Sequence, residues 1–393
     1  MSKTIPASHS GSFESADVTF LLRFLDPSYL EIVCDSEGQV VAEEVPPTPL
    51  YQHYFHLALD RYKERLAKDL IVLAAHMVLA DCCTYHETRH IQPSEEGLVI
   101  ASLARAGTPL GVLLARTLRA LNVPCRHYSI GLCPVTGVDQ MALDHILQRY
   151  RPEQLLFFDG WTAKGAVFST LAESLRRYSR ERGVEVTPRL YCLSDLAGVC
   201  TGCATREDYL IPSSLLNATG CGLISRTFTT TLEALSGTEV EGFHYAFYFN
   251  RLESFDLSRF FIDSLWQEIK TLLSGDWRQN LGVAMSFRQE YRQRQQEQAQ
   301  KLHGNKPLEI LPGQRPDTVS YLCQKYETTK GAIKPGITEA TRAMLRRNCG
   351  KLVLKDLDNA DVRHLLVLAS EKNVRVIEDH ELSCQAAALL ASK

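Results

Sequence analysis

The chain has 393 residues, a formal net charge of −3 and 23% charged residues. It is long enough for two domains with buried cores, and it is neither a strongly basic nucleic-acid binder nor a disordered acidic chain. Twelve cysteines lack the spacing of a small secreted domain, and the N-terminal stretch has no signal-peptide apolar run. No stretch reaches the roughly 18 consecutive apolar residues of a spanning helix. We therefore expect reduced thiols, a cytoplasmic location and no membrane segment.

Strand-like and helix-like segments alternate through the first 250 residues. Apolar strand patterns occupy 18–25, 98–104, 126–132, 155–159, 189–195 and 243–249. Helical spacing occupies 51–81, 108–121 and 138–150, the last with Asp139 as a candidate N-cap. Strands separated by helices predict an α/β fold with a doubly wound parallel sheet, in which ligands bind at the carboxyl ends of the strands.

The stretch LLFFDGWTAKGA, residues 155–166, predicts a buried strand that ends at Asp159 and a short loop leading into a helix. Backbone N–H groups at a helix N-terminus form a binding site for anions. The predicted phosphate-binding loop consists of Thr162, Ala163, Lys164, Gly165 and Ala166. The alternative is that Asp159 merely caps the turn.

A second strand, turn and helix follow the same pattern in LVIASLARAGTPLG, residues 98–111. We expect its turn, Arg105, Ala106 and Gly107, to lie on the same edge of the sheet as the loop after Asp159. Two anion-binding turns on one edge suit a ligand with two separate phosphate groups, such as a ribose with a 5-phosphate and a 1-diphosphate. The alternative for Arg105 is a structural pairing role.

These two motifs carry a family resemblance. LLFFDGWTAKGA resembles the ribose-5-phosphate loop of type I phosphoribosyltransferases, and SLARAGTPLG is similar to their pyrophosphate loop. The resemblance implies that Asp159 contacts the ribose hydroxyls, that Arg105, Ala106 and Gly107 hold the pyrophosphate with bridging Mg²⁺, and that Asp159 and Arg105 form the catalytic set. Gly160 stands where that family has a second acid, which is a departure from the pattern.

The form FDGWTAKG, together with IPSSLLNATGCGLISRTF at 211–228, resembles the bacterial StiP-type family of tellurium-resistance and stress gene clusters. That family is described as phosphoribosyltransferase-like and is also named a cysteine protease. The resemblance implies a phosphoribosyltransferase-like domain over residues 15–285 and a role in nucleoside-like metabolite synthesis or stress response. Within it, Ser225 and Arg226 are candidates for a substrate loop, with a tight glycine turn as the alternative.

The cysteine-protease interpretation depends on a reactive thiol. Cys200 and Cys203 form a single C-x-x-C pair with no nearby histidine, so a zinc site is not predicted. The sequence leaves open whether these two thiols are reactive, metal-binding or inert. His86, His90, His127 and His244 are available as partners for a cysteine nucleophile, but no protease motif surrounds any cysteine.

The composition changes after residue 285. Residues 286–305 are rich in Gln and Arg, which predicts a solvated helix running into a linker, with a domain boundary near 303–316. Residues 306–393 predict a helix-strand-helix-strand-helix unit with strands at 350–354 and 374–379. This pattern resembles the Pelota-type branch of the ribosomal L7Ae-like RNA-binding fold. Its mildly basic charge suits RNA, and the alternative is an α/β interaction module with solvated charges.

Three functions remain in view from the sequence. The first is a phosphoribosyltransferase-like enzyme, a glycosyltransferase that acts on a phosphoribosyl diphosphate-type ligand with Mg²⁺. The alternatives are a cysteine peptidase and a non-catalytic ligand-sensing or RNA-binding protein. Gly160 favours the non-catalytic protein over the phosphoribosyltransferase. The sequence does not predict the accepting base or the oligomeric state. A homo-oligomer is one of the possible states. We also expect the first 300 residues and the tail to fold independently of each other.

Overall fold

The computed structural model describes residues 10–29, 44–82, 97–229, 242–303 and 318–391. Its centre is a six-stranded parallel sheet in the order β1-β4-β3-β7-β8-β9. The strands are β1 (Thr19–Leu21), β3 (Leu98–Leu103), β4 (Cys125–Ile130), β7 (Leu155–Thr162), β8 (Leu190–Asp195) and β9 (Gly202–Thr205). From β3 the chain passes to β4 on one side and later to β7 on the other. Such a reversal of strand order opens a crevice at the carboxyl ends of the two diverging strands.

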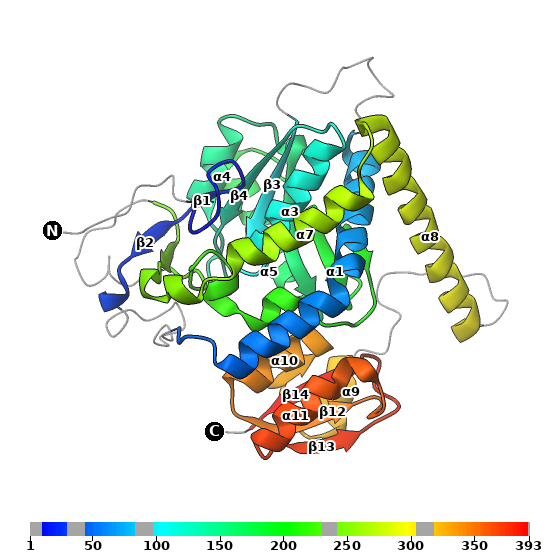
Figure 1. The fold of residues 1–393 in the computed structure, drawn as a ribbon. Helices are drawn as coiled ribbons and strands as arrows, with labels where there is room; N and C mark the ends of the chain where they lie inside the picture. Colours follow the sequence, from blue (N-terminus) through cyan, green and yellow to red (C-terminus); the bar gives the residue numbers. More distant parts are fainter. Residues whose placement is uncertain (1–9, 30–43, 83–96, 230–241, 304–317, 392–393) are drawn as a thin grey trace.

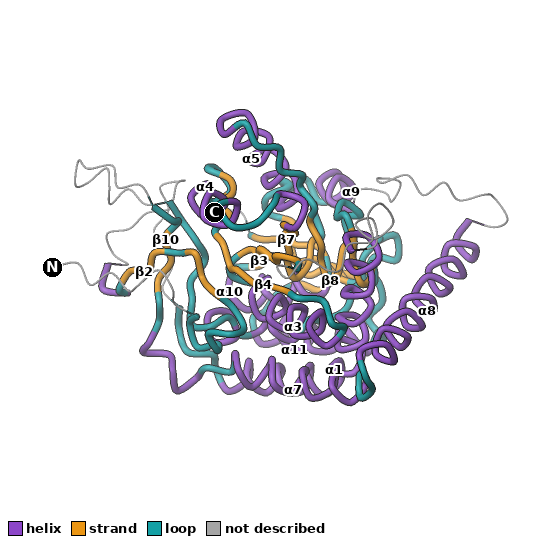
Figure 2. Tube along the Cα trace, turned by 90° about the horizontal axis from the view of Figure 1, so that it is seen from above, coloured by secondary structure: helices purple, strands orange, loops and turns teal. Residues whose placement is uncertain are grey.

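Helices cover both faces of this sheet, as Figure 2 shows. One layer contains α1 (Pro49–Met77), α3 (Gly107–Ala120) and α7 (Ser258–Leu272), and the other contains α4 (Gln140–Leu147) and α5 (Ala166–Arg182). Successive residues of β3 enter opposite cores, because Ile100 packs with the first layer and Val99 with the second. The predicted doubly wound α/β architecture is confirmed. Asp139 also caps α4, accepting the Ala142 N–H at 3.0 Å.

The N-terminal strand segment differs from the prediction. Residues 18–25 form two short strands, β1 and β2 (Arg23–Leu25), because the chain leaves the main sheet at Leu22. β2 pairs in parallel with β10 (Tyr245–Phe247) in a separate two-stranded sheet. The predicted strand at 243–249 therefore exists, but it does not belong to the central sheet.

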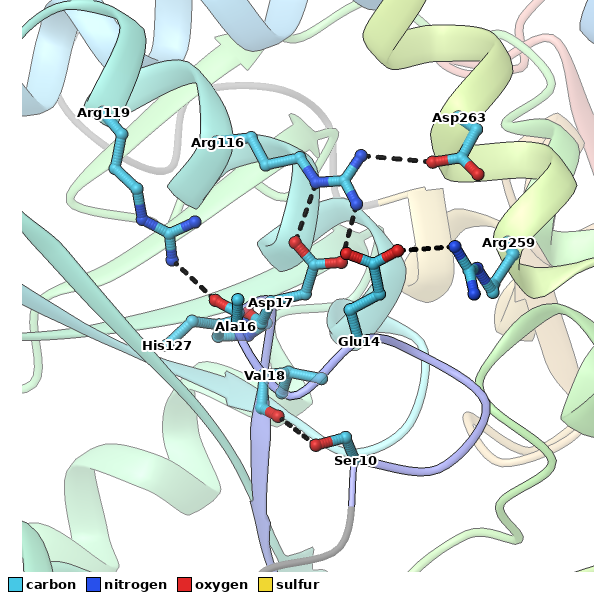
Figure 3. Close-up of polar contacts among 10 residues, drawn as sticks. All are labelled: Ser10, Glu14, Ala16, Asp17, Val18, Arg116, Arg119, His127, Arg259 and Asp263. Carbon is cyan, nitrogen blue, oxygen red and sulfur yellow. Dashed lines mark hydrogen bonds and ion pairs between the residues drawn. The ribbon is translucent and has the colours of Figure 1, made fainter.

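Charged contacts attach the edge strand β1 to the helices beneath it (Figure 3). Asp17, just before β1, accepts two hydrogen bonds from Arg116 of α3, at 2.8 and 2.6 Å. Arg116 also reaches Asp263 of α7 at 3.2 Å. The backbone carbonyl of Asp17 accepts a hydrogen bond from Nδ1 of the buried His127, whose Nε2 lies 2.8 Å from the Ser102 hydroxyl. This network links the start of β1 to α3, α7, β4 and β3.

The C-terminal unit, residues 318–391, has its own four-stranded sheet in the order β11-β14-β12-β13. Its elements are α9 (Thr318–Lys325), β11 (Ile333–Pro335), α10 (Ile337–Arg346), β12 (Cys349–Leu354), α11 (Arg363–Glu371), β13 (Arg375–Glu378) and β14 (Ala386–Leu390). The two predicted strands and the helix between them are present. The expected final helix is wrong, because its alanine-rich run forms β14. Pairing on both sides, with β11 and β12, outweighs the helix propensity of alanine.

The predicted solvated helix is the second part of α8 (Trp277–His303). Ala284 is fully buried and Phe287 packs against the main core, whereas the side chains of 292–294 are exposed. The predicted boundary between 285 and 286 thus falls inside one continuous helix. Neither α8 nor any other helix in the described ranges is long and apolar enough to cross a membrane.

The C-terminal unit joins the rest of the molecule through α10, which lies against the main domain in Figure 1. Ile337 and Met344 of α10 belong to the same buried cluster as Ile211. Asp208 accepts the N–H groups of Ile337 and Gln385, at 2.7 and 2.8 Å, so a carboxylate of one unit holds the start of α10 in the other. The two units therefore share buried core contacts, which argues against the expectation of independent folding. The apolar-poor end of α8 is not the surface on which the two units meet.

Candidate functional site at the carboxyl edge of the sheet

The turn after β3 and the strand β7 lie against each other at the predicted edge. A methyl group on Gly107 would stand 2.8 Å from the Phe158 carbonyl oxygen and 3.4 Å from Oδ1 of Asp159. The prediction that the two turns share one edge is confirmed. We call the turn at 104–107, Asp159 and the loop at 162–166 the sheet-edge site.

Asp159 lies within β7 and not at its end, because pairing with β8 continues to Thr162. Its Oδ1 accepts the Gly160 N–H at 2.8 Å. Burial raises the pKa of Asp159 to about 7, and the Gly160 N–H and the Arg342 guanidinium oppose that rise. A buried carboxyl group whose pKa is raised toward neutral is typical of a functional position.

The predicted phosphate loop does lead into a helix N-terminus. Gly165, with a φ of 76°, is the N-cap of α5, and its N–H donates to the Thr162 hydroxyl at 3.2 Å. The N–H groups of the first helical turn have no acceptor within the helix. Lys164 does not point freely into the loop, because its ammonium donates to the Lys330 carbonyl at 2.6 Å. Desolvation, and secondly Lys334, lowers the pKa of Lys164 to about 8.

The glycine that replaces the second acid has a packing reason. A methyl group on Gly160 would stand 3.3 Å from the Leu110 side chain and 3.4 Å from the Ala106 carbonyl oxygen. A carboxylate there would face a carbonyl oxygen, which repels it. A side chain at position 160 would therefore crowd the end of the Leu110 side chain, which glycine avoids.

Arg105 is held by its own chain. Its guanidinium pairs with Glu44 at 2.5 Å and donates to the Ile224 carbonyl at 2.9 Å and the Asn217 side chain at 3.3 Å. The Ala104–Arg105 peptide bond is cis. Through these two contacts the segment that contains Asn217 and Ile224 lies against the turn after β3. The structure also gives Arg105 the pairing role that the sequence left as the alternative.

Ser225 is occupied in stabilising the turn. Its hydroxyl donates to the Arg226 carbonyl at 2.6 Å and accepts the Phe247 N–H at 2.9 Å, and the residue is buried. The side chain of Arg226 is exposed. A tight structural turn, the alternative given above, accounts for the Ser225 contacts.

Two arginines of α10 reach the same region, and no local sequence pattern predicted them there. Arg342 pairs with Glu339 at 3.0 Å and lies over the Trp161 ring, 5.5 Å from its centroid. Trp161, on β7, donates its indole N–H to Glu339 at 2.7 Å. Trp161 and Glu339 also line a water-sized cavity of about 10 Å³ between β7, β8 and the start of α10. The C-terminal unit is thus a wall of the site.

Three guanidinium groups gather around Cys221. Burial raises the pKa of its thiol to about 11, and Arg105, Arg342 and Arg346 oppose that rise. Burial would also raise the pKa of Glu44, but Arg105 and Arg346 lower it overall. Cys221 therefore remains a thiol, and the surroundings carry an excess of positive charge. Residues so far apart in the sequence offer no local pattern that could have predicted this.

In the C-x-x-C pair, the surroundings of Cys203 do not activate its thiol. Burial raises the pKa of Cys203 to about 12, and Cys192 hydrogen-bonds to Cys200. Within the described ranges no group of three or more His, Cys, Asp or Glu side chains could hold a metal ion. A buried thiol with a raised pKa is a poor nucleophile at neutral pH.

A different cysteine lies beside a histidine. Cys133 Sγ is 3.6 Å from Nδ1 of His244, and Asp139 accepts the backbone N–H of His244. Cys133 follows β4, so this pair also lies at the carboxyl edge of the sheet. Burial raises the pKa of Cys133 to about 11 and lowers that of His244, so both groups are neutral as they stand. Of the other predicted partners, His127 faces Ser102, and His86 and His90 lie outside the described residues.

Comparison with known proteins places these observations in a family. Residues 11–266 match the family described as tellurite-like stress resistance cysteine protease StiP, and residues 315–392 match the PELOTA RNA binding domain. The chain is 32% identical over 386 residues to the cysteine protease StiP of Acinetobacter baylyi, covering 94% of this chain and 91% of that protein.

Solved structures show only a distant likeness. Hypoxanthine phosphoribosyltransferase from Trypanosoma cruzi is 14% identical over 37% of this chain and 82% of its own, with a TM-score of 0.27. The same enzyme in complex with its product IMP gives 14% identity over 37% and 76%, also with a TM-score of 0.27. Nothing below depends on these similarities. The family match over most of the chain and the near full-length relative do show a relationship, and on them the chain belongs to the StiP family.

Proposed function

We propose that the sheet-edge site binds a phosphoribosyl diphosphate-like ligand and transfers or releases its ribosyl group. The observation that carries this proposal is the contact between Gly107 and Asp159, which sets a half-buried backbone turn beside a carboxyl group with a pKa of about 7. The free N–H groups at the start of α5 complete a second anion position on the same edge. Two anion positions flanking a carboxyl group match a ribose that carries phosphate at both ends.

Each part of the site has a distinct task in this proposal. The amides at 106–107 bind the diphosphate and stabilise the negative charge that grows on it as the anomeric bond breaks. Asp159 accepts hydrogen bonds from the ribose hydroxyls and fixes the ring. The N-terminus of α5 binds the 5-phosphate, and this remote binding energy positions the anomeric carbon.

Mg²⁺ fits the site only as an ion carried by the ligand. Glu44 and Glu339 are both paired with arginines, whereas Asp159 forms no ion pair with a described residue. Mg²⁺ in such sites takes one or two carboxylates together with phosphate oxygens and water. Asp159 is then the carboxylate that this chain offers, and the ion would supply positive charge to the departing diphosphate.

Calorimetry with phosphoribosyl diphosphate, with and without Mg²⁺, tests this function. We expect the wild-type chain to bind and Asp159→Asn to bind about tenfold or more weakly, because a charge-assisted acceptor is lost. Glu173→Gln, which removes an exposed carboxylate on α5, is the matched control and should bind like the wild type. Absence of binding by the wild type, or equal affinity in Asp159→Asn, would refute the proposal.

A second candidate is a cysteine peptidase, and the Cys133–His244 contact favours it. A histidine within reach of a thiol can take its proton and activate it as a nucleophile. The name of the family and of the Acinetobacter baylyi relative supports this chemistry. The opposing fact is that Cys133 is only 1% exposed, so a substrate reaches the thiol only if the segment around it opens.

Labelling with an electrophilic peptide probe decides the peptidase question. If the function is correct, mass spectrometry finds the probe on Cys133, and both Cys133→Ser and His244→Gln abolish labelling and peptide cleavage. Cys200→Ser serves as the control and should leave both unchanged. A probe that labels only other cysteines would exclude the Cys133–His244 pair as a peptidase site.

The PELOTA match supports RNA as a partner of the C-terminal unit. RNA contacts through phosphates release counterions, so the affinity should fall as salt rises. A gel-shift series with the full chain and a structured RNA at several salt concentrations measures this. No shift at the lowest salt would argue against RNA.

A further inference from the structure

We propose that Arg342 and Arg346, on α10 of the C-terminal unit, bind a phosphate group of the ligand at the sheet edge. This inference rests on the proposed function above and extends it, because it makes the C-terminal unit part of the binding site. The two positions are four residues apart, so their side chains lie on the same face of the helix. That face looks toward Arg105 and Cys221 of the main domain.

The charge balance of this cluster calls for an anion. Arg105 is neutralised by Glu44 at 2.5 Å, and Arg342 by Glu339 at 3.0 Å. Arg346 has no ion pair with any residue that the structure describes. Loss of hydration, and then repulsion from Arg342 and Arg105, lowers the pKa of Arg346 well below the usual value. A cation repelled by its neighbours gains most from a bound anion.

The hydrogen-bonding capacity of Arg346 is also largely unused. The contact that the described residues give its guanidinium is a long one, 3.5 Å to the Ser214 carbonyl oxygen. The Ser214 hydroxyl itself is buried and has no partner in the described part of the chain. A guanidinium offers five N–H donors in a planar fork that matches phosphate oxygens. Neighbouring groups remove much of the hydration of the guanidinium, but Arg346 as a residue keeps a solvent-exposed surface through which a ligand can approach.

Rigid attachment of α10 makes this arrangement usable. Asp208 accepts the N–H of Ile337, and the Thr338 hydroxyl donates to the Tyr209 carbonyl at 2.9 Å and accepts the Ile211 N–H at 3.0 Å. The helix that carries the two arginines is therefore fixed relative to β7 and the sheet edge. A site assembled from two fixed units needs no rearrangement to bind a phosphate group.

Calorimetry with inorganic diphosphate at low salt tests the inference. We expect Arg346→Gln to weaken binding by about tenfold or more, because a hydrogen-bonded charge is lost. Arg347→Gln removes the same charge one residue later, from an exposed side chain that acts on Lys334, and should stay within about twofold. A thermal melt of each variant checks that it is folded. No diphosphate binding by the wild type, or equal losses in both variants, would overturn the proposal.

Further arms identify the source of the phosphate and separate this inference from the proposed function. A short RNA with a 5′-phosphate is compared with the same RNA ending in a hydroxyl; a preference for the phosphate that Arg346→Gln removes assigns the site to RNA ends. Phosphoribosyl diphosphate binding that depends on Asp159 but not on Arg346 refutes the inference and leaves the function standing. If diphosphate binds in a way that depends on Arg346 but phosphoribosyl diphosphate does not bind at all, the proposed function is refuted and the role of Arg346 stands.

Discussion

Arg116 forms two charge-assisted hydrogen bonds with the buried carboxylate of Asp17, at 2.8 and 2.6 Å. The two side chains are 13% and 5% exposed, so solvent cannot replace either partner. Arg116→Ala would leave an uncompensated carboxylate beneath strand β1. We expect this variant to lose about 3–5 kcal/mol of unfolding free energy.

Denaturant titration measures this loss, and Figure 3 contains the matched control. Arg259 pairs with Glu14 at 2.5 Å in the same region, but both side chains are more than half exposed, at 54% and 53%. Arg259→Ala should therefore cost less than about 1 kcal/mol. Equal losses in the two variants would show that burial does not determine the strength of the Arg116 pair.

An acid introduced at position 160 should lower the unfolding free energy of the protein. The side chain of Gly160→Asp would meet the Leu110 side chain and the Ala106 carbonyl oxygen, at the distances of 3.3 and 3.4 Å where a methyl group already makes close contact. We expect a loss of about 1–3 kcal/mol from overpacking, with a smaller loss in Gly160→Ala. Thermal melts compare the two variants. A Gly160→Asp chain that is as stable as the wild type would show that the edge can accommodate a second acid.

The buried His127 should make the protein sensitive to acid. Burial lowers its pKa from 6.5 to about 3, so between these pH values the unfolded chain binds a proton that the folded chain does not. Stability is therefore lost as pH falls below about 6.5, at up to about 1.4 kcal/mol per pH unit from this group. Denaturant titrations from pH 7.5 to 4 should give a shallower slope for His127→Gln. The exposed His53→Gln should retain the wild-type slope, and a His127→Gln slope equal to wild type would contradict the assignment.

A chain that ends at residue 303 should be poorly stable. It lacks α10, which covers Leu210, Ile211 and Leu215 in the shared core. Exposing these side chains costs about 1.5–3 kcal/mol each. We expect a lower melting temperature and binding of a hydrophobic dye, both measured against the full chain. A truncated chain with an unchanged melting temperature would restore the expectation of two independent domains.

Local sequence patterns were enough to predict the alternation of strands and helices, the parallel sheet and the meeting of the two turns at one edge. These features follow from short-range patterns: a buried run that ends in Asp159, and an Arg-Gly turn before an apolar helix. Parallel strands present their carboxyl ends together, so two such motifs in neighbouring strands must share an edge. Short apolar patterns likewise predicted the strands β12 and β13 of the C-terminal unit.

The charges that surround that edge are brought together by long-range packing and could not be predicted from local patterns. Arg105 and Arg346 are more than 200 positions apart, and Cys133 and His244 more than 100, so no periodicity connects them. The Ala-rich β14 was misjudged because its two strand neighbours, not its own propensity, determine its conformation. The interface was missed for a related reason: the sequence showed a solvated linker, whereas the surface that joins the units is α10, whose buried face becomes apparent only when it packs on Ile211. Long-range packing and desolvation act on residues that the fold brings together, and local sequence carries no record of them.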